Sequence, residues 1–146
     1  MLSKSCEYAI RSVLCVASHQ HSYPDKSIGI KQISDSLQIP VHFLGKVMQN
    51  LTRQQILQSA KGKNGGFFLT PKQLDTPIMR IVEVVDSSLY FNRCGLGLEK
   101  CSDEHPCALH NDFAVFRDGF AKALRTHTIS SMTIAHQKGD IHLVSL

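Results

Sequence analysis

The chain has 146 residues, of which 42% are hydrophobic and 19% are charged, and it contains no Trp. This length is enough to bury one core but not two large ones. Near the start, the longest apolar run covers residues 13–17. That run is too short for a secretory signal or for a membrane span of ~20 residues, so we expect a soluble, cytoplasmic protein.

The formal net charge of +4 is distributed unevenly along the chain. Residues 1–72 carry nine basic and three acidic side chains, a net charge of +6, and the remainder has a net charge of −2. A basic front half predicts that one end of the molecule meets a polyanion.

The first half of the chain shows a helical pattern in three segments. Apolar residues three and four apart predict a helix over residues 2–18, and a loop follows at residues 23–25. Ile33 and Leu37 predict a short helix over residues 30–37. Because proline is tolerated in the first turn of a helix, Pro40 is expected to open a third helix that runs to about residue 53.

Two short strands are predicted after these helices, over residues 57–61 and 66–70. The sequence Gly62-Lys63-Asn64-Gly65 lies between them, and Asn-Gly favours a tight hairpin because both residues tolerate positive φ. A helix-turn-helix followed by a basic hairpin is typical of a winged helix. We therefore expect a mainly α fold with a small β wing, in which residues 1–75 form a DNA-binding domain.

In a winged helix, the second helix of the helix-turn-helix enters the major groove and the hairpin contacts the DNA backbone or minor groove. The side chains here that can donate to phosphates or base edges belong to the two helices and the hairpin. The candidate DNA-binding residues are Lys31, His42, Lys46, Asn50, Arg53, Lys61, Lys63 and Asn64. The alternative is an ordinary solvated surface. Gly45, in mid-helix, is expected to permit a close approach to DNA.

Residues 76–146 are expected to form the second region. Thr76 and Pro77 predict the N-cap and first residue of a helix that continues to Leu89. Pro106 predicts the start of a long helix that ends near residue 125. Its apolar stripe, Leu109, Phe113, Phe116, Phe120 and Leu124, needs a partner, and a second copy of the chain is the simplest one. A weaker segment covers residues 130–136.

Three of the five cysteines lie in one stretch, Cys94, Cys101 and Cys107, with the pattern C-x6-C-x5-C-x2-H ending at His110. Three soft thiolates on a glycine-containing loop can enclose one metal centre. Cys107 is expected in the first turn of the long helix, where the helix dipole favours a thiolate. His110 would then lie one turn further on the same face. Two other cysteines, at positions 6 and 15, fit the apolar face of the first helix.

The spacing of these cysteines differs from the paired C-x2-C pattern of structural zinc sites and from the ferredoxin pattern. Long, unequal gaps favour a loop around a larger inorganic core, so an iron-sulfur cluster is the preferred interpretation. Structural zinc, and free or redox-active thiols, remain as alternatives. An enzyme using Cys107 and His110 as nucleophile and base is not expected, because no substrate domain is recognisable.

The order of these parts resembles the IscR/NsrR-like (Rrf-type) family of bacterial winged-helix transcription regulators, many of which carry an iron-sulfur cluster. The resemblance covers nearly the whole chain. It rests on the opening KSCEYAIR at residues 4–11, on residues 32–44 of the helix-turn-helix, on KGKNGGFFL at residues 61–69, and on the triple cysteine before a long helix. It implies a homodimer joined through the long helices, a roughly palindromic site on double-stranded DNA, and one cluster per subunit near the dimer interface.

Two features of this chain leave the cluster type and its fourth ligand open. Six residues separate Cys94 from Cys101, where relatives often have five, so both 2Fe-2S and 4Fe-4S fit. The family's fourth ligand is either a histidine two residues after the third cysteine, here His110, or an acidic residue of the partner's first helix, here Glu7. His110 is preferred because it shares a local segment with the cysteines. The expected function is a DNA-binding regulator that senses iron-sulfur, redox or nitric oxide status.

Overall fold

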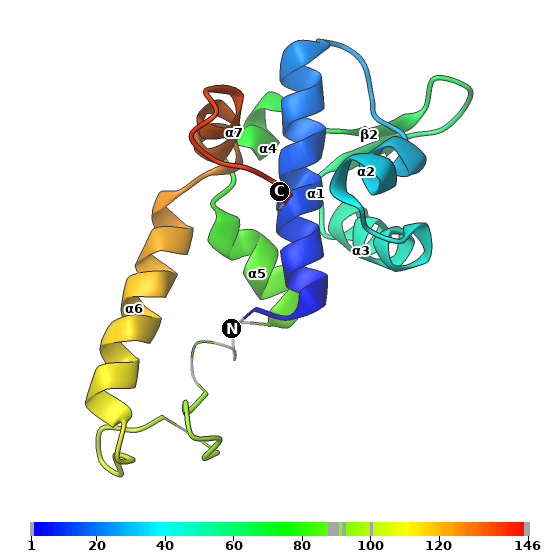
Figure 1. Ribbon diagram of the computed structural model, residues 1–146. Coiled ribbons are helices and arrows are strands. Elements are labelled where there is room, and N and C mark those ends of the chain that lie inside the picture. Colours follow the sequence, from blue (N-terminus) through cyan, green and yellow to red (C-terminus); the bar gives the residue numbers. More distant parts are fainter. Residues whose placement is uncertain (1, 88–90, 92, 100, 145–146) are drawn as a thin grey trace.

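The computed structural model describes residues 2–87, 91, 93–99 and 101–144. Its elements follow one another in the order α1 (Lys4–Ser22), α2 (Ile30–Leu37), α3 (Val41–Arg53), β1 (Gln58–Ala60), β2 (Gly66–Phe68), α4 (Pro71–Leu74), α5 (Ile78–Asp86), α6 (His110–Thr126) and α7 (Ile129–Gln137). Figure 1 shows α1 upright in the middle, α2, α3 and the hairpin on one side of it, and α6 leading away from the body. The expected mainly α fold with a two-stranded wing is confirmed.

The core is built around α1, which packs against α2, α3, α5 and α7. Every residue from Ser12 to Ser18 is buried, so the middle of this helix is covered on all sides, and Val13 and Leu14 are fully buried there. Leu44 of α3 and Ile81 of α5 complete this core. The side chain of Ser3 caps the helix by accepting a hydrogen bond from the Cys6 amide (3.1 Å).

The helix-turn-helix has the predicted boundaries, with one shift at Pro40. That residue is the N-cap of α3 and not its first helical residue, with a ψ of 132° that lies outside the helical range. Gln38 takes the left-handed conformation that ends α2, and Ile39 is buried at the turn. Ser34 fixes the turn by donating its hydroxyl proton to the carbonyl oxygen of Ile39 (2.6 Å).

The hairpin pairs β1 with β2 in antiparallel register and is shorter than predicted, with three residues in each strand. Positive φ occurs at Gly62 and Gly66, whereas Asn64 and Gly65, the expected positions, do not have it. The wing also joins the segment before α2, because Ile28 and Phe67 exchange two backbone hydrogen bonds of 3.0 and 2.9 Å. The segment at Ile28 thus pairs with β2 on its other edge, and this pairing holds the wing against the helix-turn-helix.

Two predicted boundaries in the second half differ from the structure, and a third falls on residues that it does not describe. Thr76 is not the N-cap of α5, because Pro77 holds that position with extended backbone. The predicted continuation to Leu89 lies outside the described residues. The long helix begins at His110 rather than at Pro106, since an irregular turn occupies the residues between them.

The short helix α4 was missing from the predicted elements. Thr70 caps it by accepting a hydrogen bond from the Gln73 amide (3.3 Å), while the Gln73 side chain accepts one from the Thr70 amide (2.9 Å). This reciprocal capping box, with Pro71 at the first helical position, is a signal that the sequence contains.

Helix α7 and the tail return to the N-terminal half of the chain. Arg11 of α1 donates to the Leu143 carbonyl oxygen of the tail (2.5 Å) and to the Leu37 carbonyl oxygen at the end of α2 (2.8 Å). The segment 130–136, predicted only weakly, is the helix α7, and it packs against α1. Among the described residues, no helix is long and apolar enough to cross a membrane.

Candidate metal centre and nucleic-acid interface

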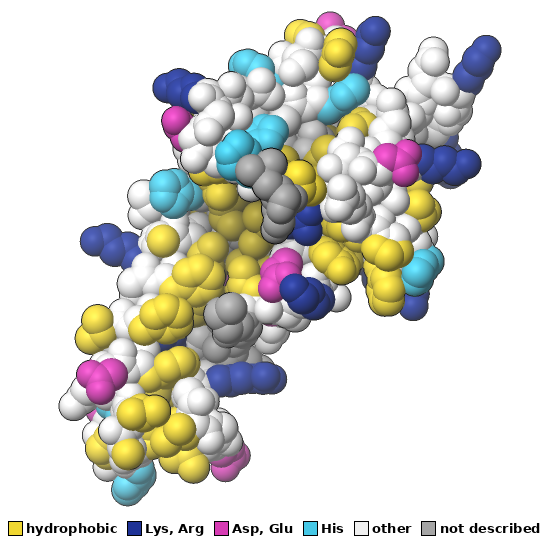
Figure 2. All heavy atoms as spheres, viewed as in Figure 1, with side chains coloured by type: hydrophobic (Ala, Val, Ile, Leu, Met, Phe, Trp, Pro, Cys, Tyr) yellow, Lys and Arg dark blue, Asp and Glu magenta, His cyan; other side chains and the backbone are white. Residues whose placement is uncertain are grey.

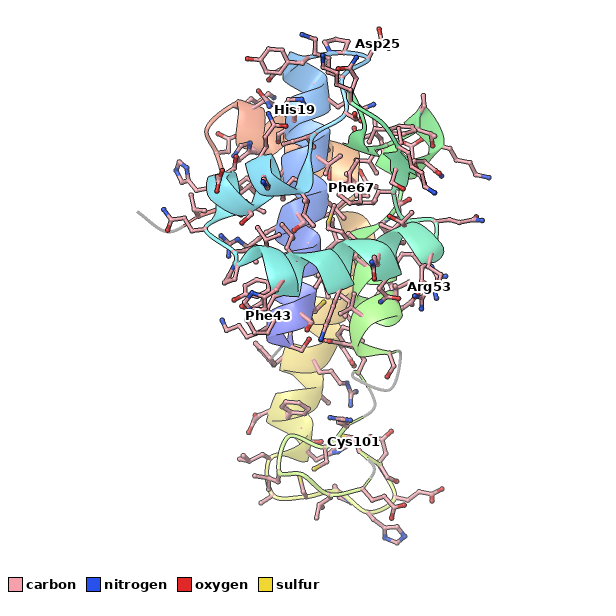
Figure 3. All side chains as sticks on the ribbon, turned by 90° about the vertical axis from the view of Figure 1, so that its right-hand side faces the viewer. His19, Asp25, Phe43, Arg53, Phe67 and Cys101 are labelled. Carbon is pink, nitrogen blue, oxygen red and sulfur yellow. The ribbon has the colours of Figure 1, made fainter. Side chains whose placement is uncertain are left out.

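The cysteine segment connects α5 to α6 and lies at the far end of α6, away from α2 and α3 (Figure 1). Figure 3 shows Cys101 in this segment near the lower end of the molecule, well below α3 and the wing residue Phe67 in the body. The candidate residues for metal binding therefore lie apart from those for DNA contact, which are on the body of the subunit.

The structure brings the four predicted ligands together as two pairs. The sulfur atoms of Cys94 and Cys107 are 3.7 Å apart. The sulfur of Cys101 lies 3.4 Å from Nδ1 of His110. Within the described part of the chain, no three His, Cys, Asp or Glu side chains form a group that could hold a metal ion.

Cys94 has surroundings that favour a thiolate. Its side chain is buried, and its sulfur accepts a hydrogen bond from the Leu96 amide (3.4 Å). Backbone hydrogen bonds, chiefly this one, lower the pKa of Cys94, and the Cys107 side chain contributes in the same direction. The next residue, Gly95, packs so tightly on the Phe113 ring that an added Cβ would lie 2.7 Å from it. A thiolate held by backbone amides on a tightly packed loop is a suitable soft-metal ligand.

His110 is buried at the first position of α6 and is oriented from both sides of its ring. Its Nε2 lies 2.7 Å from a carboxylate oxygen of Asp103, and its Nδ1 faces Cys101. A carboxylate on one ring nitrogen commonly orients the other toward a metal. Asp103 was not among the predicted site residues, although an acidic residue seven positions before a candidate ligand is visible in the cysteine segment.

Cys107 precedes α6 and is not in its first turn, so the expected effect of the helix dipole on this thiol is wrong. The His110 amide donates to the Cys107 carbonyl oxygen (3.0 Å), which forms a tight turn before the helix. The chain between Pro106 and the helix is therefore a turn, and it places the Cys107 thiol beside that of Cys94.

The other proposed fourth ligand, Glu7, lies on α1. Its carboxylate pairs with the Lys4 ammonium (2.6 Å) on the surface. Cys6 and Cys15 occupy the core, as expected from the apolar face of α1. Burial raises the pKa of Cys6 to about 12, helped by the nearby Asp86 carboxylate, and burial raises that of Cys15 to about 11. These two thiols stay protonated and unavailable as ligands near neutral pH.

The candidate DNA-binding side chains lie on the helix-turn-helix and the wing, and nearly all are exposed. The exposed ones are Lys31, His42, Lys46, Arg53, Lys61, Lys63 and Asn64, and Asn50 is half-buried. Figure 3 shows α3 crossing the face of the molecule, with Phe43 near one end and Arg53 at the other. Two exposed apolar residues of α3, Val41 and Phe43, were not among the predicted site residues.

A helix-turn-helix with a docked basic hairpin, followed in the chain by a thiol-rich segment and a long helix, defines a winged-helix DNA-binding regulator. Residues 2–134 match the Rrf2 family, described as iron-dependent transcriptional regulators. The chain therefore belongs to the Rrf2 family. The family consists of transcriptional regulators and not enzymes, in agreement with the sequence-based expectation.

Known relatives support this assignment over most of the chain. An HTH-type transcriptional regulator of Aquifex aeolicus is 25% identical over 140 residues, with 94% of each chain covered. The HTH-type transcriptional regulator IscR of Pectobacterium atrosepticum is 24% identical over 131 residues, which cover 90% of this chain and 77% of IscR.

Solved structures show the same fold at low sequence identity. CymR, the global cysteine regulator of B. subtilis, superimposes with a TM-score of 0.74 at 15% identity, covering 92% of this chain and 96% of CymR. T. potens IscR superimposes with a TM-score of 0.70 at 15% identity, covering 97% of this chain and 92% of IscR.

Proposed function

We propose that this protein is a cytoplasmic, homodimeric transcription regulator whose DNA affinity depends on an iron-sulfur cluster held by Cys94, Cys101, Cys107 and His110. The observation that carries the proposal is the pairing of these four side chains beside α6, with a buried, amide-stabilised thiol at Cys94. The description of the family as iron-dependent supports it further.

The donor set fits an iron-sulfur cluster. The three thiols are soft donors, imidazole suits iron, and N–H groups directed at a sulfur are among the features that tune such clusters. When bound, the cluster would supply a redox-active and chemically labile group. The residues that would hold it are already positioned. The sulfurs of Cys94 and Cys107 are 3.7 Å apart, and Asp103 orients the His110 ring so that Nδ1 faces Cys101.

The dimer is proposed to form through α6. Val115 and Phe116 of this helix have exposed fractions of 76% and 60%. Figure 2 shows apolar side chains along α6 and on the segment below it. Burying such a face against a second copy removes it from water, and a two-fold dimer presents two recognition helices to two half-sites. A roughly palindromic operator on double-stranded DNA follows from that symmetry.

DNA contact is assigned to α3 and the wing. Lys46 and Arg53 lie on the outer part of α3, and Lys61 and Lys63 flank the hairpin turn. These cations would release counterions from DNA, so binding should weaken steeply as salt is raised. Binding that does not respond to salt would contradict this assignment.

Purification without oxygen tests the cluster directly. A brown protein with visible absorption and stoichiometric iron and sulfide is the expected result. A colourless protein that contains zinc would refute the cluster and indicate a structural zinc site instead. Comparison of H110A with E7A then identifies the fourth ligand: H110A should lose or perturb the cluster, and E7A should retain it. The reverse result would assign the ligand to Glu7 of the second subunit.

A second candidate function is a metal-free thiol switch. The 3.7 Å separation of the Cys94 and Cys107 sulfurs and the lowered pKa of Cys94 favour it, because a thiolate close to a second thiol is readily oxidised. A colourless, metal-free protein that forms the Cys94–Cys107 disulfide under mild oxidant, with a change in DNA affinity, would establish this alternative.

A further inference from the structure

The first turn of α3 presents apolar side chains to solvent. Val41 and Phe43 have exposed fractions of 43% and 54%, whereas Leu44, the next residue, is fully buried. Figure 3 shows Phe43 at the beginning of α3. Within the described residues of the helix-turn-helix and the wing, these are the exposed large hydrophobic side chains.

Packing within the chain gives no reason for this exposure. The Phe43 ring contacts the His42 ring, with centroids 4.3 Å apart, and His42 is itself exposed. The face is also separate from the apolar face proposed for the dimer, because α3 lies on the body and α6 leads away from it (Figure 1). A second copy that docks through α6 therefore leaves the first turn of α3 uncovered.

Gly45 makes the surface beside Val41 shallow. A Cβ at this position would meet nothing closer than Cδ1 of Ile30, at 3.9 Å, so the fold has room for alanine. Glycine costs ~1 kcal/mol relative to alanine inside a helix. Because residues four apart share a helix face, the gap at Gly45 lies one turn along from Val41. A surface that closely approaches α3 at this point explains why a side chain is missing.

The major groove of DNA presents apolar groups where the first turn of a recognition helix lies. The N-terminal residues of a recognition helix are those that meet base edges in the major groove. The thymine C5-methyl is an apolar group in that groove, and apolar side chains contact it. We propose that Val41 and Phe43 read thymine methyl groups in the operator. The proposal deepens the assignment of α3 as the DNA-reading helix and rests on it.

The test needs an operator, which is obtained by selecting bound duplexes from a random double-stranded DNA pool with the wild-type protein. Each thymine of the selected half-site is then replaced by deoxyuridine, which removes only the methyl group. The expected result is a loss of affinity of about 3- to 5-fold at one or two thymines per half-site, from ~0.8 kcal/mol per buried methyl-sized group. Other thymines should show no effect.

Variants assign the effect to residues. F43A or V41A should bind the thymine and deoxyuridine duplexes equally well at the sensitive positions. Q49A, an exposed change on the same helix, is the control and should keep the full difference. Because Val41 and Phe43 are exposed, both variants should fold, and circular dichroism checks this.

Two results would overturn the proposal. Each can be told apart from a result that refutes the proposed function itself. If deoxyuridine leaves the affinity of the wild type unchanged at every position, no methyl is read. If the wild type is sensitive and V41A and F43A keep that sensitivity, another residue reads the methyl. If selection yields no preferred sequence, sequence reading by α3 itself is refuted, and the inference falls with it.

Discussion

Substitution of Gly66 by alanine should detach the wing from the helix-turn-helix. Gly66 opens β2 with a φ of +153°, and a Cβ there would lie 2.5 Å from the Ile28 carbonyl oxygen and 2.7 Å from its carbon. Both atoms belong to the backbone, so no side-chain rotation relieves the clash. The strand must move away from the segment that precedes α2.

The size of the effect follows from the hydrogen bonds that break when the strand moves. Two backbone hydrogen bonds join Ile28 to Phe67, and the Ser27 hydroxyl donates to the Asn64 carbonyl oxygen at 2.9 Å. At about 1 kcal/mol for each hydrogen bond, G66A should lower the free energy of unfolding by about 3 kcal/mol. DNA affinity should fall as well, because the lysines of the wing are no longer fixed beside α3. Urea unfolding followed by circular dichroism, and titration with operator DNA, measure the two effects.

Gly62 is the matched control for this experiment. Its φ is +104°, and no atom lies within 4 Å of the position a Cβ would take. G62A therefore carries the backbone strain of a positive φ, about 1–2 kcal/mol, without a clash. If G66A and G62A were equally stable and bound DNA equally well, contact with Ile28 would not be what holds the wing in place.

Three further changes probe other parts of the molecule. R11K should lower the unfolding free energy by about 2 kcal/mol, because one ammonium cannot replace the guanidinium that joins the end of α2 to the tail; an unchanged urea midpoint would refute this. In metal-free protein, alkylation at about pH 8 should modify Cys94 well before Cys6. Backbone amides lower the pKa of Cys94, whereas burial raises the pKa of Cys6 to about 12. Equal rates by mass spectrometry would contradict the assignment. D103N should speed cluster loss about 10-fold under oxygen, while the neighbouring control E104Q keeps the wild-type rate; loss at the same rate in both would show that the carboxylate does not hold the histidine.

The helix-turn-helix was predictable because local signals agree there. The spacing of Ile33 and Leu37, the proline after them and the buried stripe of α3 all specify helix, turn and helix within a short stretch. Pro40 was misplaced by one position, because proline fits the N-cap almost as readily as the first helical residue. The residues of the wing were recognised by their glycines and basic side chains, although the positive φ values fell on Gly62 and Gly66.

The ligand geometry needed tertiary information. Sequence spacing placed Cys107 inside the helix because Pro106 is a good helix opener, but the chain instead turns so that this thiol meets Cys94. The contact of Asp103 with His110 depends on the path of the loop, which no periodicity encodes. The exposure of Phe43 also required the structure, since the next residue, Leu44, is equally apolar and is fully buried.

The N-terminus of α1 provides a route between the two ends of the subunit. Ser3, which caps α1, donates its amide proton to the Asp86 carboxylate (2.9 Å), and its hydroxyl bonds to the same group. Asp86 ends α5, and the cysteine segment follows soon after it. Helix α1 packs in turn on α2 and α3, so a rearrangement that moves Asp86 also moves the support of the recognition helix. A coupling of about 1–3 kcal/mol along this route, the usual size of coupling between two sites, would change DNA affinity by about 5- to 150-fold within one subunit.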